Sequence, residues 1–103
     1  MPADVESARL EWEHAYRDFS ELARDPVLEE RSRSQVRAVT TELRRRLGGS
    51  FTLRELADLY STADTWARHV LSEQGAQDWP RTLTLVEGAA FHLYSRGAAD
   101  YSP

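Results

Sequence analysis

The chain has 103 residues, with 17 acidic and 13 basic side chains and a formal net charge of −4. This length fits one domain covering residues 1–103, and a hydrophobic content of 41% is too high for a disordered chain. Cysteine is absent, which excludes disulfides and thiolate metal sites, and no apolar run approaches the roughly 20 residues that span a bilayer. Because the first thirty residues are acidic and lack the apolar run of a signal peptide, we expect a cytoplasmic protein that does not associate with membranes.

The charges are unevenly distributed along the chain. Residues 1–30 have a net charge of −6, residues 31–54 of +6, and residues 55–103 of −4. All 13 basic residues are arginine, a bias that the codon usage of a GC-rich genome explains and that also suits carboxylate or phosphate partners. The basic middle segment is therefore the first place to look for a binding surface.

Two amphipathic helices are predicted in the first half of the chain, over residues 4–24 and 26–47. Their apolar side chains recur at steps of three and four, the spacing that forms one face of an α-helix. Asp4 and Asp25 are suited to cap the two N-termini, and Pro26 needs no amide partner in a first turn. Gly48 can adopt the left-handed conformation that ends a helix.

A third helix is predicted over residues 52–74. Thr52 and Glu55 form a capping box, in which each side chain accepts a hydrogen bond from the backbone amide of the other residue. The apolar residues that follow spread over about half of the helix circumference, which indicates contact with two neighbours. We therefore expect this helix to be the central one. Nothing between Tyr60 and Trp66 breaks a helix, so the pattern favours one continuous helix.

Residues 79–96 complete the predicted fold as a fourth helix, with Asp78 as its cap and Gly75 ending the helix before it. Its main apolar residues fit helical spacing. Residues 82–94 also fit a β-hairpin, because polar and apolar residues alternate before Gly88. The predicted fold class is an all-α, single-domain bundle of four helices, with a winged helix-turn-helix as the alternative.

Part of the third segment resembles the helix-turn-helix of bacterial transcription regulators. The small and apolar positions of that motif are matched by Leu56, Ala57, Tyr60, Ala67 and Val70. Two positions depart from the motif, because Ser61 stands where glycine is usual and Thr62 where an aliphatic residue is usual. The resemblance covers about twenty residues of the 103.

This resemblance implies a bend near residues 61–64 and a function in DNA binding. Thr65, Arg68 and His69 would then contact the groove of the DNA. The winged form of the motif requires the hairpin over residues 82–94. Acidic side chains beside Arg68 are unfavourable for DNA, which is itself strongly acidic.

The helix predicted over residues 26–47 carries a basic surface. At 100° per residue, Arg33, Arg37 and Arg44 lie on one flank, and Arg45 and Arg46 extend the cluster at the C-terminal end. Such a surface suits phosphates or an acidic partner protein. The alternative is pairing within the chain, in surface ion pairs with the acidic helix over residues 4–24.

Leu85 and Phe91 lie off the main apolar stripe of residues 79–96. In a simple four-helix bundle both would be exposed, and they would form an apolar patch suited to a protein interface. Burial of the fourth helix on two sides is the alternative. Together with the five arginines, these two residues are the predicted partner-binding residues.

Catalysis and metal binding find little support in the sequence. No nucleophile elbow, phosphate-binding glycine loop or zinc-protease motif is present. His14, His69 and His92 fall away from the apolar stripes, and no second Glu-x-x-His accompanies the one at Glu11. We therefore expect no enzyme activity, no cofactor and no metal.

The predicted function is a non-enzymatic interaction or regulatory adaptor module. Its partner would be another protein or a second copy of the chain. The alternative function is a DNA-binding transcriptional regulator, with nucleic acid as the partner.

Overall fold

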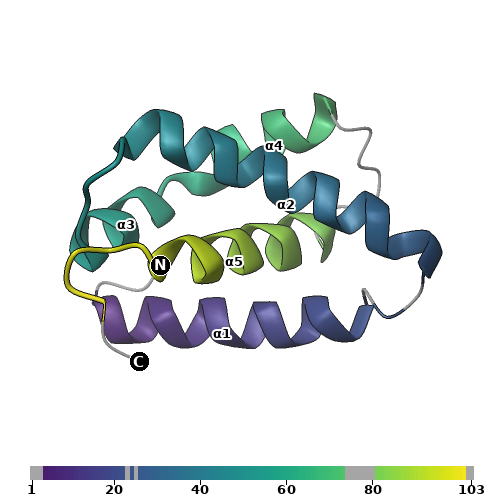
Figure 1. Ribbon diagram of the computed structural model, residues 1–103, viewed down its shortest axis with the longest axis horizontal. Coiled ribbons are helices and arrows are strands. Elements are labelled where there is room, and N and C mark those ends of the chain that lie inside the picture. Colours follow the sequence, from purple (N-terminus) through teal and green to yellow (C-terminus); the bar gives the residue numbers. More distant parts are fainter. Residues whose placement is uncertain (1–3, 23, 25, 74–80, 102–103) are drawn as a thin grey trace.

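Helices account for all regular structure in the part of the chain that the structure describes. The structure, a computed structural model, describes residues 4–22, 24, 26–73 and 81–101. Within these residues the helices are α1 (Val5–Leu22), α2 (Pro26–Leu47), α3 (Leu53–Tyr60), α4 (Ala63–Glu73) and α5 (Arg81–Ser95) (Figure 1). The predicted all-α class is confirmed. The hairpin over residues 82–94, and with it the winged form, is wrong because this segment is helical.

The ends of the helices follow the predicted caps where the structure describes them. The backbone amide of Ser7 donates to the Asp4 carboxylate at 2.7 Å. In the capping box, the Glu55 amide donates to the Thr52 hydroxyl at 3.2 Å and the Thr52 amide to the Glu55 carboxylate at 3.0 Å. Gly48 ends α2 with a φ of +74°, a conformation that glycine adopts without a steric penalty. The caps predicted at Asp25 and Asp78 and the helix stop predicted at Gly75 lie outside the described residues.

The predicted continuous helix over residues 52–74 is wrong, because α3 and α4 are separated at Ser61 and Thr62. Both hydroxyl groups bond back to the end of α3: Ser61 Oγ donates to Asp58 O at 2.6 Å, and Thr62 Oγ1 donates to Leu59 O at 3.2 Å. The Thr62 amide also donates to Leu59 O, at 3.1 Å. Such short-range bonds compete with the bonding pattern of an α-helix and end α3. The described part of the bundle therefore has five helices where four were predicted over the whole chain.

α5 is the central helix, in place of the predicted segment over residues 52–74. Figure 1 shows α5 running between α1 and α2, antiparallel to α1, and α5 also packs against α3 and α4. The cause lies in its composition, because Glu87 is the only Asp, Glu, Lys or Arg in residues 83–94. A helix that is apolar nearly all round is most stable when neighbours cover every side.

The central position of α5 buries the two residues that were predicted to form an exposed patch. Leu85 is 8% exposed and Phe91 is 0% exposed. The Phe91 ring lies 5.1 Å from the Tyr60 ring and 5.6 Å from the Trp12 ring, measured between centres. The prediction that Leu85 and Phe91 are exposed is therefore wrong, and neither offers a surface to a partner in this structure.

The segment after α5 is irregular but attached to the loop between α2 and α3. The Ala99 amide donates to Phe51 O at 2.9 Å, and the Leu53 amide donates to the Asp100 carboxylate at 2.8 Å. The Tyr94 ring stacks on the Phe51 ring, with 4.8 Å between their centres. These contacts fix the C-terminal end of α5 relative to the start of α3. The Cα radius of gyration, 12.8 Å, is that of a compact domain of this length.

α1 and α5 approach each other closely at Ala15 and Gly88. A Cβ atom placed on Gly88 would clash with the Cβ of Ala15. Two carbon atoms cannot approach so closely without strong repulsion, so only glycine fits at this point of α5.

Replacing Gly88 with alanine is expected to lower the free energy of unfolding by about 1–3 kcal/mol, as overpacking does elsewhere. The higher helix propensity of alanine, worth about 1 kcal/mol, opposes this loss but does not cancel it. Urea denaturation followed by circular dichroism measures the change. The double variant Ala15→Gly/Gly88→Ala returns the lost space, and we expect it to regain most of the stability. A Gly88→Ala protein as stable as the parent would contradict the close contact.

Candidate functional site

A groove lies between α1 and α2, with α5 at its base. Its volume is about 480 Å³. The lining side chains come from all three helices: Tyr16, Phe19 and Ser20 of α1, Arg33, Val36, Arg37 and Thr40 of α2, and Leu93 of α5. Phe19 and Val36 are buried, whereas Ser20, Arg33 and Arg37 are exposed. The groove therefore has an apolar floor and a polar rim that is basic on the α2 side.

The groove exists because α1 and α2 direct their apolar sides toward α5. Both helices pack extensively on α5, and they have few contacts with each other. This packing is favourable because it removes the apolar stripe of each outer helix from water. The space between the two helices, next to Leu93, is left open.

Two arginines stand on the α2 side of the groove. Arg33 and Arg37 are four residues apart, so they lie one helical turn apart on the same side of α2. Thr40 follows on this side, with its hydroxyl donating to Val36 O at 2.8 Å. Guanidinium groups at this spacing can bind two carboxylates on successive turns of a helix.

Tyr16 on α1 and His92 on α5 form a stacked pair at the edge of the groove. Their ring centres are 4.7 Å apart. Burial, and next the nearby Arg96 guanidinium, lower the pKa of His92, which favours a neutral ring at neutral pH. His92 is half-buried in this stack, although it falls away from the main apolar stripe of its segment; the solvent-facing position expected from that pattern is wrong.

The other three predicted arginines lie beyond the groove, at the C-terminal end of α2. Arg45 and Arg46 both bind the Glu42 carboxylate, and the hydrogen bond from Arg45 is the main cause that lowers the pKa of Glu42. The Arg46 guanidinium also lies 4.9 Å from the centre of the Trp66 ring, which connects α2 to α4. Arg44 is exposed and has no ion-pair partner among the described residues. Arg45 and Arg46 thus make contacts within the protein that lie outside the groove.

Two acidic residues of α1, Glu13 and Glu21, pair with arginines of their own segment. Glu13 lies 3.2 Å from Arg17, and Glu21 lies 3.2 Å from Arg24. These contacts replace the ion pairs with α2 that the sequence suggested for the two glutamates.

The three residues implied by the helix-turn-helix resemblance lie together on α4. Thr65, Arg68 and His69 are all exposed, and His69 lies 3.2 Å from Glu73, an ion pair when the histidine is protonated. In a helix-turn-helix the two helices pack against each other, whereas α3 and α4 have few mutual contacts. The structure has the break that the motif requires but not the packing.

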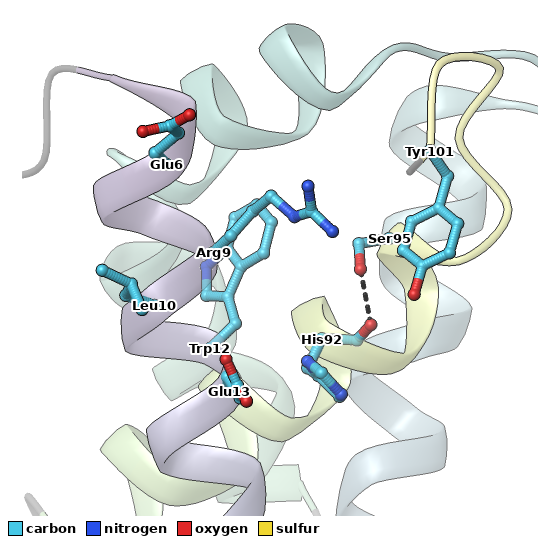
Figure 2. A pocket seen from close by; sticks show the side chains of 8 residues that line it. All are labelled: Glu6, Arg9, Leu10, Trp12, Glu13, His92, Ser95 and Tyr101. Atoms are coloured by element: carbon cyan, nitrogen blue, oxygen red, sulfur yellow. Dashed lines mark hydrogen bonds between the residues drawn. The ribbon is translucent and has the colours of Figure 1, made fainter. Parts of the chain in front are cut away.

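A second hollow, of about 320 Å³, opens between α1 and the C-terminal end of α5 (Figure 2). The Arg9 guanidinium lies 5.4 Å from the centre of the Tyr101 ring, and Ser95 Oγ donates to His92 O at 2.6 Å. Figure 2 shows Glu6 and Leu10 on the α1 side of the hollow, facing away from Tyr101. Because the lining carries charges of both signs, it indicates no single class of ligand.

A buried carboxyl group on α5 was not anticipated. Glu87 is 3% exposed. Burial, followed by a hydrogen bond to Asp64 of α4, raises the pKa of Glu87 to about 8. Nearby, the Tyr60 hydroxyl of α3 donates to Glu11 Oε1 of α1 at 2.9 Å. Glu87 lines neither of the two hollows, so neither brings a substrate to it.

The described residues include no group of three or more histidine, aspartate or glutamate side chains placed to hold a metal ion. None of the helices in these residues combines the length and the apolar character that a membrane span requires. No protein-family model matches the chain, and comparisons with curated proteins and with solved structures find no match. The chemistry of the groove is therefore the basis for a functional assignment.

Sequence reasoning identified the arginines of the groove but not its apolar lining. Phe19, Val36 and Leu93 fall on apolar stripes or beside them, where core residues and groove residues follow the same pattern. Glu87 was also missed, although a signal existed. A lone charge in an otherwise uncharged segment of helical length indicates a buried carboxyl group.

Replacing Glu87 with glutamine is expected to change how stability depends on pH. The folded-state pKa of Glu87 is raised from 4.5 to about 8, so the folded protein holds this proton more tightly than the unfolded chain. The resulting stabilisation is complete below about pH 4.5 and is lost as the pH rises through 8. Between pH 5 and pH 9 the loss is roughly 4 kcal/mol. Urea denaturation across this pH range measures the loss of stability. The Glu87→Gln protein should lack this pH dependence.

Comparing the parent protein with Glu87→Gln separates the contribution of Glu87 from the contributions of the other titratable groups. The lowered pKa of His92 makes its own contribution rise with pH near 6.5, the opposite sign, and it is present in both proteins. Parallel stability curves for the parent and Glu87→Gln would rule out a raised pKa at this residue.

Proposed function

We propose that this protein is a non-enzymatic, cytoplasmic interaction module that binds an acidic segment of a partner protein in the groove between α1 and α2. One observation carries the proposal: Arg33 and Arg37 border a groove whose floor is apolar. Positive charge beside an apolar floor suits a segment that carries both carboxylates and apolar anchors.

An amphipathic helix is the occupant that this chemistry fits. Its apolar side chains would contact Phe19 and Leu93, and carboxylates four residues apart would reach Arg33 and Arg37. Arg44 continues the same row, about 16 Å along α2 from Arg33 at 1.5 Å per residue. Three turns of a bound helix match this length.

Self-association is a less favourable reading of the same surface. Among the described residues, Leu10 is the large apolar side chain that stands exposed, at 55%. Leu10 lines the second hollow and not the groove, and a stable homodimer buries a larger apolar interface than one leucine supplies. The basic groove therefore favours a separate, acidic partner over a second copy.

Photo-crosslinking tests the groove directly. A photoreactive amino acid is placed at Ser20, on the rim of the groove, and, as the control, at His14, an exposed position of α1 outside it. Nuclease-treated cell extract supplies the partner, which is identified by mass spectrometry and then purified. We expect capture from Ser20 and not from His14.

Charge reversal then tests the recognition. Arg33→Glu/Arg37→Glu is expected to weaken binding of the purified partner by about tenfold or more, because reversing charges on the rim of an interface replaces attraction with repulsion and slows association. Calorimetric titration measures the affinity. Arg31→Glu is the matched control, since it makes the same type of charge change on the same helix at an exposed position outside the groove. Equal losses in both variants, or equal capture from His14, would refute the groove as the binding site.

A DNA-binding regulator is the second candidate, and the break between α3 and α4 is the observation that favours it. In this case Thr65, Arg68 and His69 would contact bases, and Arg44, Arg45 and Arg46 would contact phosphates. The acidic residues Asp64 and Glu73 on α4 weigh against this function, because they repel the phosphate backbone.

For this second candidate, Arg68→Ala is expected to weaken DNA binding by about 1–3 kcal/mol, or roughly 5- to 150-fold. Fluorescence anisotropy with duplex fragments at several salt concentrations measures the affinity. Affinity that does not change in the Arg68→Ala protein would count against DNA contact through α4.

A further inference from the structure

Five side chains from four helices act on one another where α3 ends and α4 begins. Glu87 of α5 hydrogen-bonds Asp64, which lies in the first turn of α4. Glu11 of α1 and Arg68 of α4 act on the same carboxyl, Glu11 favouring its protonated form and Arg68 its ionised form. Tyr60, the last residue of α3, donates its hydroxyl to Glu11 at 2.9 Å. This cluster connects both sides of the α3–α4 break to the central helix.

The break makes α4 a separate unit of the fold. The last carbonyl groups of α3 bond to the hydroxyls of Ser61 and Thr62, and α3 has few contacts with α4. α4 is instead held by packing on α2 and α5 and by the cluster around Glu87. A change in that cluster therefore acts on α4 without requiring α3 to move.

We propose that Glu87 is a proton-operated latch for α4. With its proton, the Glu87 carboxyl donates a hydrogen bond to the ionised Asp64 carboxylate and holds the first turn of α4 against α5. Without the proton, Glu87, Asp64 and Glu11 are three carboxylates beside one guanidinium, that of Arg68. Their repulsion weakens the attachment of α4, which then separates from α5 at the Ser61–Thr62 break.

The surroundings of Glu87 bring this change into the neutral pH range. Burial and the contact with Asp64 raise the pKa of Glu87 to about 8. Glu87 is buried whereas Asp64 is exposed, and burial disfavours the ionised form, so the proton stays on Glu87. When α4 separates, Glu87 returns to water and its ordinary proton affinity. The equilibrium constant for closure of α4 therefore falls about tenfold for each pH unit until the pH reaches about 8, above which it changes little.

Amide hydrogen exchange of the full chain, corrected for intrinsic exchange rates, tests the latch between pH 6 and pH 9.5. We expect the amides of residues 63–73 to exchange faster than those of α1 at every pH. Their exchange should depend only weakly on added urea, as local opening does. Their protection should fall about tenfold between pH 7 and pH 9.

Substitutions test whether Glu87 is the group that titrates. Glu87→Gln keeps the shape and a donor for Asp64, so protection of residues 63–73 should vary less than about twofold with pH. Glu13→Gln, an exposed carboxylate of α1, is the matched control and should keep the pH dependence of the parent.

Two further substitutions at exposed positions separate titration from a general loss of packing. Asp64→Asn removes a charge that favours protonation of Glu87, so the pH at which protection levels off should move down. Arg68→Ala removes a charge that opposes protonation, so this pH should move up. A role in packing alone would not shift the pH in opposite directions.

Three results would each overturn the proposal. The first is protection of residues 63–73 that does not change with pH in the parent protein. The second is the same urea dependence for α4 and α1, which would mean that α4 opens only when the whole protein unfolds. The third is a pH dependence that persists in Glu87→Gln.

Discussion

The close contact between α1 and α5 at Ala15 and Gly88 sets the positions of the other helices. Because Gly88 has no side chain, α1 lies near enough to α5 for the Trp12 and Phe91 rings to meet, with 5.6 Å between centres. Tyr60 of α3 and Trp66 of α4 add their rings to the same cluster. Aromatic side chains bury large areas and gain further from edge contacts, so this cluster is a major source of the hydrophobic stabilisation. The outer helices are consequently arranged around α5.

A bundle with one central helix leaves space between its outer helices. Each outer helix has one apolar stripe, and α1 and α2 both place theirs against α5. The edges of these stripes are formed by residues such as Phe19 and Val36, which belong to the core and to the groove at once. This arrangement explains why the floor of the groove is apolar while the flanking arginines remain in water. Had α1 packed directly on α2, the same residues would be ordinary core residues and no groove would exist.

The features that could be predicted from the sequence depend on residues close together in the chain. The limits of α2, the capping box at Thr52 and the end of α2 at Gly48 are of this kind. The central helix could not be identified from stripes, because an assignment of one buried face per helix fails for a helix that is covered on most sides. The break at Ser61 was missed for another reason: its hydroxyl bonds to α3 compete with helix continuation by only a small free energy, which propensities do not resolve. For the site, Arg33 and Arg37 could be predicted as a basic face, but the groove beside them depends on tertiary packing.

Glu87 is a charged residue within the otherwise uncharged residues 83–94 of α5. An apolar residue of similar size would fill the same space without the cost of burying a carboxyl group, and such local conflicts with stability are typical of functional positions. Glu87 and Leu93 are six residues apart, which places them about 120° apart around α5 and about 9 Å apart along it. Glu87 therefore acts on the side of α5 that faces α3 and α4, whereas Leu93 faces the groove. The groove is lined by α1, α2 and α5 and not by α4, so that protonation of Glu87 and binding of an acidic segment are independent unless α2 or α5 itself shifts.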